Sequence, residues 1–467
     1  MSRLLPGWTL VATALAIFMV SLDNLVVTNA LTSIREDLGA SLEALEWTVN
    51  AYTLAFAVFL LTGAALGDRY GRRRVFVIGL AIFTAASAAA ALAPSTGALI
   101  AARAVQGLGA GIIAPLSLTI LSDAVPAERR GLALGVWSGV SGLGVALGPL
   151  VGGAVIEGIS WQWIFWLNVP VGLALAPLAA RRLAESHGPA NRLDLPGLAL
   201  GSTGLLGVVF GVVRGNPAGW GSLEVVAPIA AGAVLLVAFV GWELRAAAPM
   251  LPMRFFRSRQ FAATNGVSLA MTFGIFGSIF LLAQFFQTVQ GYSPLEAGLR
   301  TLPWTGMPML VAPVAGILSD RLGSRPLMAA GLFLQAAALM WLATVTETDV
   351  AYGALVPAFV MGGTGMALVF APAANAVLGA VRPEEAGQAS GANNAIRELG
   401  GVLGVAVLAA VFTGAGGFAS PQAFVDGLVP ALWVGAAVLV GGGLAALLIP
   451  GRRHQGGAEA LSAPAAA

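Results

Sequence analysis

Two residues that carry charge lie inside stretches that are otherwise apolar. Asp23 stands within WTLVATALAIFMVSLDNLVVTNAL, which starts at Trp8, and Arg103 stands within the apolar stretch 97–120. At 1.5 Å per residue, Asp23 is about 22 Å from Trp8, and Arg103 is about 9 Å from the start of its stretch. If the two stretches cross a bilayer core roughly 30 Å thick in opposite directions, the charges lie at a similar depth.

A carboxylate inside a bilayer is costly, so it faces a cavity, finds a partner or takes a proton. Arg103 stays protonated and favours a charged carboxylate, whereas burial favours the neutral acid, and an acid between these influences can titrate in a useful range. Gln106 lies on the same helix face as Arg103 and can hydrogen-bond to either group. We predict that Asp23 and Arg103 couple protons to transport; the alternative is a structural carboxylate or ion pair.

Other side chains in the apolar stretches are candidates for binding a small molecule. Amides and aromatic rings suit amphiphilic, aromatic or cationic ligands, although lipid-facing aromatic residues give the same composition. The predicted substrate-binding residues are Trp47, Asn50, Gln106, Phe280 and Gln284. Glu157 lies near the outer end of the fifth stretch and is a candidate second acid of the proton pathway, with an exposed loop acid as the alternative.

The composition is that of an integral membrane protein. Of 467 residues, 58% are hydrophobic and 10% are charged, whereas soluble chains carry about 25% charged residues. Fourteen apolar stretches have the length of a spanning helix and lack the alternation of barrel strands, which predicts an all-α fold. The net charge of +2 gives no reason to expect a nucleic-acid partner, and the absence of cysteine excludes disulfides and thiolate ligands. We expect no metal site.

The arginines predict how the chain crosses the membrane. All 24 basic residues are arginine, which indicates a G+C-rich, bacterial genome. With the amino terminus inside, 20 arginines fall in inner loops and tails, three fall in outer loops, and Arg103 alone lies within a helix. This bias predicts 14 helices with both termini in the cytoplasm, and hence a multi-pass protein of the bacterial plasma membrane.

An internal repeat divides the chain. ALGDRYGRRR (65–74) is echoed by ILSDRLGSRP (317–326) at an offset of 252, and a set of glycines repeats at an offset of 256. Two extra helices near 195–213 and 225–244 account for the long offset, which gives a six-two-six arrangement. The predicted units are a first half, a two-helix linker, a second half and a disordered cytoplasmic tail, spanning 1–185, 186–255, 256–450 and 451–467.

Two further motifs have a clear physical reading. Proline bends a helix and glycines let another backbone approach closely; a helix with this pattern contains Gly139, Gly148, Pro149, Gly152 and Gly153. In the first inner loop, Gly71 allows a tight turn and Asp68 can pair with an arginine or a helix end. The loop motif and its second copy contain Gly67, Asp68, Arg69, Gly71, Arg72, Asp320 and Arg321.

Together these motifs resemble the Major Facilitator Superfamily, and within it the 14-helix drug:proton antiporters of the EmrB/QacA type. The resemblance covers residues 22 to about 449 and rests on LDNLVVTNAL, WTVNAYTL, GDRYGRRR, RAVQGLGAG and GVSGLGVALGPLVGG. Thr32 stands where the family usually has proline. The resemblance implies a proton-coupling role for Arg103, a bent antiporter helix between the halves, and a loop latch that holds the inner side shut.

The resulting hypothesis is proton-coupled efflux, by alternating access, of small amphiphilic or cationic compounds such as drugs, dyes or antibiotics. The alternatives are export of a lipid or endogenous metabolite, or proton symport, on the same fold. An enzyme is disfavoured because the only histidines, His187 and His454, lie in an inner loop and tail beside no acid motif. We expect a monomer in contact with membrane lipids, driven by the proton motive force and without a cofactor.

Overall fold

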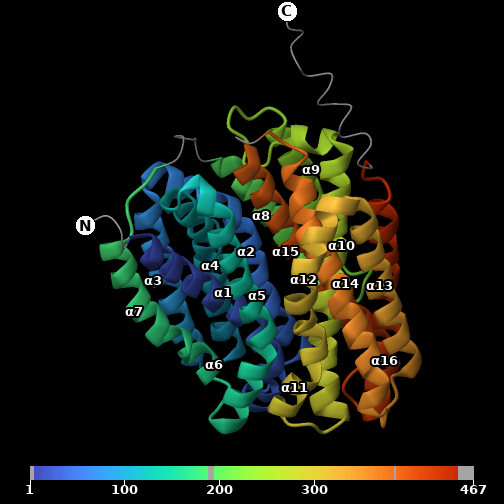
Figure 1. The fold of residues 1–467 in the computed structure, drawn as a ribbon. Helices are drawn as coiled ribbons and strands as arrows, with labels where there is room; N and C mark the ends of the chain where they lie inside the picture. The colour runs from blue at the N-terminus through green and yellow to red at the C-terminus, as the bar shows by residue number, and fades with distance from the viewer. Residues whose placement is uncertain (1–4, 188–193, 383–384, 451–467) are drawn as a thin grey trace, which may run out of the picture.

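The computed structural model describes residues 5–187, 194–382 and 385–450, and the described part is helical throughout (Figure 1). Thirteen helices are long and apolar enough to cross a membrane, and the bent pair Leu42–Leu60 and Thr62–Tyr70 raises the number to 14. The predicted all-α membrane architecture is therefore confirmed. The first six spans are formed by α1 (Leu5–Leu38), α2 (Leu42–Tyr70), α3 (Arg72–Ala91), α4 (Thr96–Ala124), α5 (Ala127–Gly158), and α6 (Trp163–Trp166) with α7 (Asn168–Arg182).

The remaining eight spans follow the six-two-six order. The extra pair is α8 (Leu195–Ala218) and α9 (Leu223–Glu243). A 3-10 turn, η1 (Met253–Arg257), then leads into the second group. That group comprises α10 (Arg259–Gln284) with the π-turn η2 (Phe285–Val289), α11 (Pro294–Thr305) with α12 (Met307–Leu322), α13 (Ser324–Val345), α14 (Tyr352–Leu378), α15 (Ala386–Ala415) and α16 (Pro421–Ala446).

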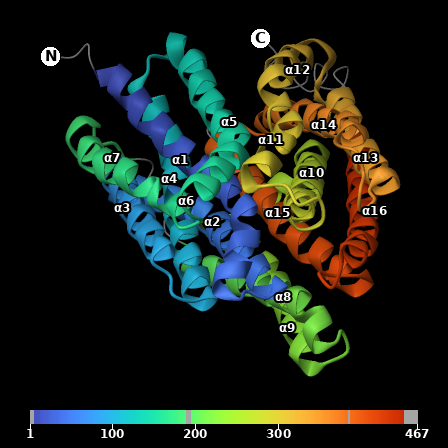
Figure 2. The same ribbon diagram turned by 90° about the horizontal axis from the view of Figure 1, so that it is seen from below.

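The two groups of six spans stand side by side (Figure 2). The predicted boundary at 185/186 falls after α7, and the boundary at 255/256 falls within η1; the predicted tail, 451–467, lies outside the described residues. The extra helices lie at the edge of the junction, where Val209 of α8 packs with Leu54 of α2 and Val402 of α15. Helix α8 therefore contacts both groups.

Helix breaks recur at equivalent points of the repeat. Gly71 ends α2 with φ 102°, and Gly323 ends α12 with φ 84°, a backbone region that residues with a Cβ avoid. A Cβ on Gly71 would also lie 2.8 Å from the Glu185 carboxylate carbon. Glycine is thus required at Gly71 for two independent reasons, and the tight turn predicted there is present.

One predicted boundary is wrong. Helix α15 begins at Ala386, ten residues before the apolar stretch 396–415 from which it was predicted. Its first turns carry Gln388, Asn393 and Asn394, which line a cavity and not lipid, so hydropathy does not reveal them. Arg397 consequently lies inside a spanning helix, and the expectation that Arg103 is the only arginine in such a position fails.

Candidate functional site: a cavity and a buried ion pair

A cavity of about 1680 Å³ separates the two groups of helices. Its deep wall includes Asn24 of α1, Phe276 of α10 and Trp304 of α11, and its mouth includes Arg72 and Arg254, which belong to the arginine-rich inner side. The cavity therefore opens towards the cytoplasm.

The mouth carries charges that are already paired. Arg72 hydrogen-bonds to Asp68 and to Asp123, both in the first group of helices. Arg254 pairs with Glu385 at 2.6 Å. The Arg382 side chain also donates to Glu385, and the pKa of that carboxyl is held below its ordinary value by this hydrogen bond.

The outer side is closed by direct backbone contact between the C-terminal part of α5 and α11, which lies at the bottom of Figure 1. A Cβ on Gly153 would lie 2.4 Å from the carbonyl oxygen of Pro294, and a Cβ on Gly298 would lie 2.3 Å from that of Pro149. Asn29 of α1 donates to the Pro149 carbonyl at 2.7 Å. Because glycine alone leaves room for this approach, the two halves are sealed together at the outer side.

The antiporter-helix glycines do not all serve this seal. Cβ atoms on Gly148 and Gly152 would meet α1, at Leu25 and Val26, so these two positions pack α5 on α1 within the first half. Gly139 has no atom within 4 Å of its Cβ position and lines the cavity. The close approach predicted from the motif is therefore found at four of its positions, Pro149 included, and not at Gly139.

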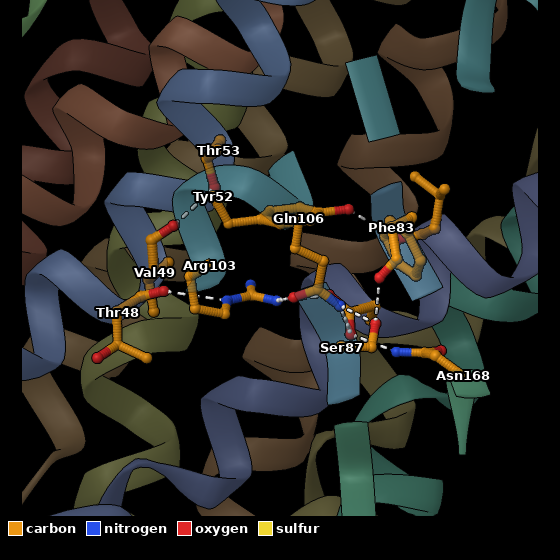
Figure 3. A network of polar contacts seen from close by, with 11 residues as sticks. Thr48, Val49, Tyr52, Thr53, Phe83, Ser87, Arg103, Gln106 and Asn168 are labelled. Carbon is orange, nitrogen blue, oxygen red and sulfur yellow. Dashed lines mark hydrogen bonds and ion pairs between the residues drawn. The ribbon is translucent and has the colours of Figure 1, made fainter. Parts of the chain in front are cut away.

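Asp23 is the centre of a buried polar network in the first half. Arg103 of α4 donates to Asp23 Oδ2 at 2.5 Å, while Gln106 of α4 and Asn168 of α7 donate to Asp23 Oδ1 at 2.8 and 2.7 Å. Figure 3 shows Arg103 and Gln106 of α4 and Asn168 of α7, with Ser87 of α3 accepting a further bond from Gln106. Asp23 thus accepts three hydrogen bonds, an arrangement that suits a charged carboxylate.

Arg103 is held equally closely. Its Nε donates to the carbonyl oxygen of Thr48, and its guanidinium carbon lies 4.1 Å from the centre of the Tyr52 ring (Figure 3). Arg103 and Asp23 are both fully buried, and their charges cancel. The cation–π contact and the ion pair together compensate for placing a guanidinium inside the membrane. The structure therefore brings together Asp23 and Arg103, which sequence analysis placed at a similar depth, and Gln106, which it placed on the same helix face as Arg103.

Asp23 does not line the cavity. Its neighbours Val20, Ser21 and Asn24 on α1 do, whereas the Asp23 side chain points to α4 and α7. In this conformation the Asp23 carboxylate is therefore separated from the cavity, and cargo in the cavity would not contact it.

The five predicted substrate-binding residues do not line the cavity either. Trp47 packs against Phe210 of α8 with ring centres 6.3 Å apart. The Asn50 side chain is fully buried and has no hydrogen-bond partner among the described residues, and Gln106 belongs to the Asp23 network. Phe280 and Gln284 are buried in α10, where Gln284 donates to the Phe280 carbonyl. Aromatic residues and amides inside the apolar stretches here fill the interior of each half, which composition alone cannot distinguish from a binding wall.

Glu157 and the loop motif also have definite positions. Glu157 is exposed at the outer end of α5, where it accepts a 3.4 Å hydrogen bond from the Leu295 amide of α11. It lies outside the cavity, as the alternative of an exposed acid anticipated.

In the loop motif, Gly67 packs on Leu116 of α4, and Asp68 bonds to Arg72 within its own half. Arg69 lies over the Tyr70 ring at 5.3 Å, while Arg321 is exposed in the second half. The Asp320 side chain lies outside the described residues. Asp68 bonds within its own half while the inner side is open, which is the arrangement expected of a latch that is released.

Sequence reasoning missed several polar residues inside the spans, among them Ser87, Asn168, Arg397 and Glu398. Asn168 was detectable, because an amide within the apolar stretch 162–180 needs a partner there. Arg397 and Glu398 were not, because they stand at the start of the predicted stretch 396–415 and were read as inner-side residues, whereas the helix begins ten residues earlier, at Ala386. Both line the cavity.

Two groups of six spans around a cavity that opens on one side define a membrane transporter. The chain belongs to the Major Facilitator Superfamily, whose sequence profile matches residues 13–405. It is 35% identical over 427 residues to the tetracenomycin C resistance and export protein of Streptomyces glaucescens, covering 91% of this chain and 79% of the relative. It is 40% identical over 424 residues to the cephamycin export protein CmcT of Amycolatopsis lactamdurans, covering 88% and 86%.

Solved structures share the fold. A bacterial homologue of the human lysosomal transporter Spinster, in an inward-facing conformation, superposes with a TM-score of 0.68 at 17% identity, covering 96% of this chain and 98% of that one. The POT family transporter PepTSo superposes with a TM-score of 0.69 at 13% identity, covering 97% of this chain and 98% of that one. The protein is a multi-pass transporter of the bacterial plasma membrane, related to exporters of antibiotics.

Proposed function

We propose that the protein exports small amphiphilic compounds from the cytosol in exchange for protons, and that Asp23 carries the exchanged proton. The observation that carries the proposal is the buried contact of Asp23 with Arg103, Gln106 and Asn168 inside one half of a transporter. An ionisable group at membrane depth is retained at a cost and marks a functional site by default. The export function of the relatives supports the direction of transport.

Protonation of Asp23 has a defined physical consequence. A neutral Asp23 no longer balances the charge of Arg103. The guanidinium then has its contacts with Thr48 and Tyr52 but no counter-ion. An unpaired buried charge is strongly unfavourable, so α1 and α4 must shift until Arg103 finds water or another partner. The charged and neutral forms of Asp23 therefore favour different packings of the first half.

Helix α1 provides a path from this change to the outer seal. Asn29 lies six residues after Asp23, about 9 Å along the helix, and donates to the Pro149 carbonyl that Gly298 approaches. A displacement of α1 would therefore alter the hydrogen bond of Asn29 at the junction of α5 and α11. In the proposed cycle, a proton reaches Asp23 from outside, the charged form returns when the cavity opens inwards, and cargo then enters from the cytosol.

The test is transport into proteoliposomes under an imposed pH gradient, with rhodamine 123 in a panel of amphiphilic dyes. We expect Asp23→Asn to abolish gradient-driven accumulation while dye exchange without a gradient continues, because the cavity is unchanged. The matched control is Glu36→Gln, an exposed acid on the same helix, which should behave as wild type. Gradient-driven accumulation that survives in Asp23→Asn would remove Asp23 from the coupling step.

A further inference from the structure

The second half holds another arginine–carboxylate pair, whose two side chains lie farther apart than those of Arg103 and Asp23. Arg397 and Glu398 follow one another on α15, and Arg397 lies about 16 Å from the start of that helix. Their closest approach is 3.8 Å, between Arg397 Nη2 and Glu398 Oε1, which exceeds a hydrogen-bond distance. In the Asp23–Arg103 pair, by contrast, the carboxylate accepts three hydrogen bonds.

The Arg397 guanidinium faces the cavity, and its N–H donors are available to a ligand. It lines the cavity wall, a quarter of its side chain is exposed, and its carbon lies 4.7 Å from the centre of the Phe370 ring. Within the described part of the chain, no hydrogen bond from this guanidinium is found. A guanidinium at membrane depth presents a planar fork of donors that matches a carboxylate. The stacked ring fixes the plane of that fork.

Glu398 offers the complementary group. Its side chain is 8% exposed and lines the same cavity. Its Oε2 atom is buried and has no hydrogen-bond partner in the part of the chain that the structure describes, and a buried acceptor left unpaired costs the desolvation of that group. A donor that arrives with the ligand would satisfy it.

Uncharged side chains of the same cavity wall suit the apolar portion of an amphiphilic ligand. Trp304 is 3% exposed, lines the cavity, and has an Nε1 donor without a partner among the described residues. Phe276 of α10 lines the same deep region. These side chains supply apolar contact with one additional donor, as ligand pockets generally do.

The charges discriminate between ligand classes. A cation without an acidic group would be repelled by Arg397, and an anion without a basic group would be repelled by Glu398. A ligand with both groups satisfies both residues. We propose that the cavity holds a subsite for zwitterionic amphiphiles, in which Arg397 binds the carboxylate and Glu398 binds the cationic group. The subsite narrows the class of transported compounds, which the sequence predicts to be amphiphilic or cationic, to zwitterions. The proposal rests on the proposed export function only where it identifies the bound ligand as the transported compound.

Two dyes that differ by one methyl group test the subsite. Rhodamine 110 carries a cationic ring system and a free carboxylate, and rhodamine 123 is its methyl ester. Equilibrium dialysis against the purified wild-type protein, with no pH gradient, should show tighter binding of rhodamine 110. The usual strength of a hydrogen bond to a charged group predicts that rhodamine 110 binds about 10- to 150-fold more tightly than rhodamine 123.

Variants then locate the preference. Arg397→Gln should reduce the preference to about onefold by weakening rhodamine 110 binding, while Glu398→Gln should weaken both dyes. Arg325→Gln, an exposed inner-side arginine, is the matched control and should keep the wild-type ratio. Arg397→Lys, which retains charge without the fork, provides a second variant if Arg397→Gln fails to fold.

The outcomes are separable from those of the proton-coupling test. Absent binding of rhodamine 110, equal binding of the two dyes by wild type, or a preference that survives in Arg397→Gln would each overturn the subsite. Because dialysis uses no gradient, gradient-driven accumulation that survives in Asp23→Asn, together with an intact rhodamine 110 preference, would overturn the coupling proposal alone.

Discussion

Gly153→Ala and Gly298→Ala should each open the outer seal. The added Cβ would lie 2.4 Å from the Pro294 carbonyl oxygen or 2.3 Å from the Pro149 carbonyl oxygen, closer than the 3.0 Å that real Cβ atoms keep. Both obstructing atoms are backbone, so relief requires α5 and α11 to move apart. Overpacking of this kind costs about 1–3 kcal/mol, which shifts the equilibrium away from the inward-facing state by about 5- to 150-fold.

Pulsed electron resonance between two spin labels measures this shift. The chain has no cysteine, so labels can be attached at Ile159→Cys and Leu299→Cys, which replace exposed residues on the two sides of the seal. In either alanine variant we expect a longer-distance population to grow relative to the unsubstituted pair.

Gly139→Ala is the control, because its Cβ would meet no atom within 4 Å. The reasoning is refuted if Gly153→Ala and Gly298→Ala keep the distance distribution of the parent protein, or if Gly139→Ala changes it as much as they do. Either result would mean that the glycines of this helix do not act through backbone contact.

Two further predictions concern stability. Arg103→Ala leaves Asp23 without its counter-ion and should lower the free energy of unfolding by about 3–5 kcal/mol; thermal unfolding of the purified protein measures this, and addition of Asp23→Asn should recover part of the loss. Gly71→Ala forces a side chain into a left-handed conformation at about 1–2 kcal/mol and meets Glu185. A lower Tm is expected for Gly71→Ala, and an unchanged Tm would show that the turn adapts.

The sequence was sufficient to predict most of the fold for a simple reason. In a bilayer, hydropathy marks nearly every span, arginine marks the inner side, and a helix that crosses must be long. The error at α15 has the same origin: Gln388, Asn393 and Asn394 face a cavity, where polar residues cost little, and hydropathy therefore places the helix start near residue 396 when it begins at Ala386.

The candidate site was predictable where a charge has to find a partner within the membrane. Asp23 and Arg103 meet because neither can remain alone at that depth, and the depth follows from counting residues along two helices. The cavity wall was not predictable from residue type. Trp47 and Phe280 are aromatic, as residues of a binding site often are, but both pack in the interior of the protein. Which face of a helix borders the cavity depends on tertiary packing.

The orientation of Asp23, away from the cavity and towards its own half, has an evolutionary consequence. Residues that line the cavity, such as Arg397 and Trp304, share no side-chain contact with Asp23 in the described structure. Under the proposed coupling, mutations can therefore alter the range of exported compounds without disturbing the energy source. A lineage exposed to a new antibiotic could then adapt by substitutions in the cavity wall alone and retain the proton-coupling residues unchanged.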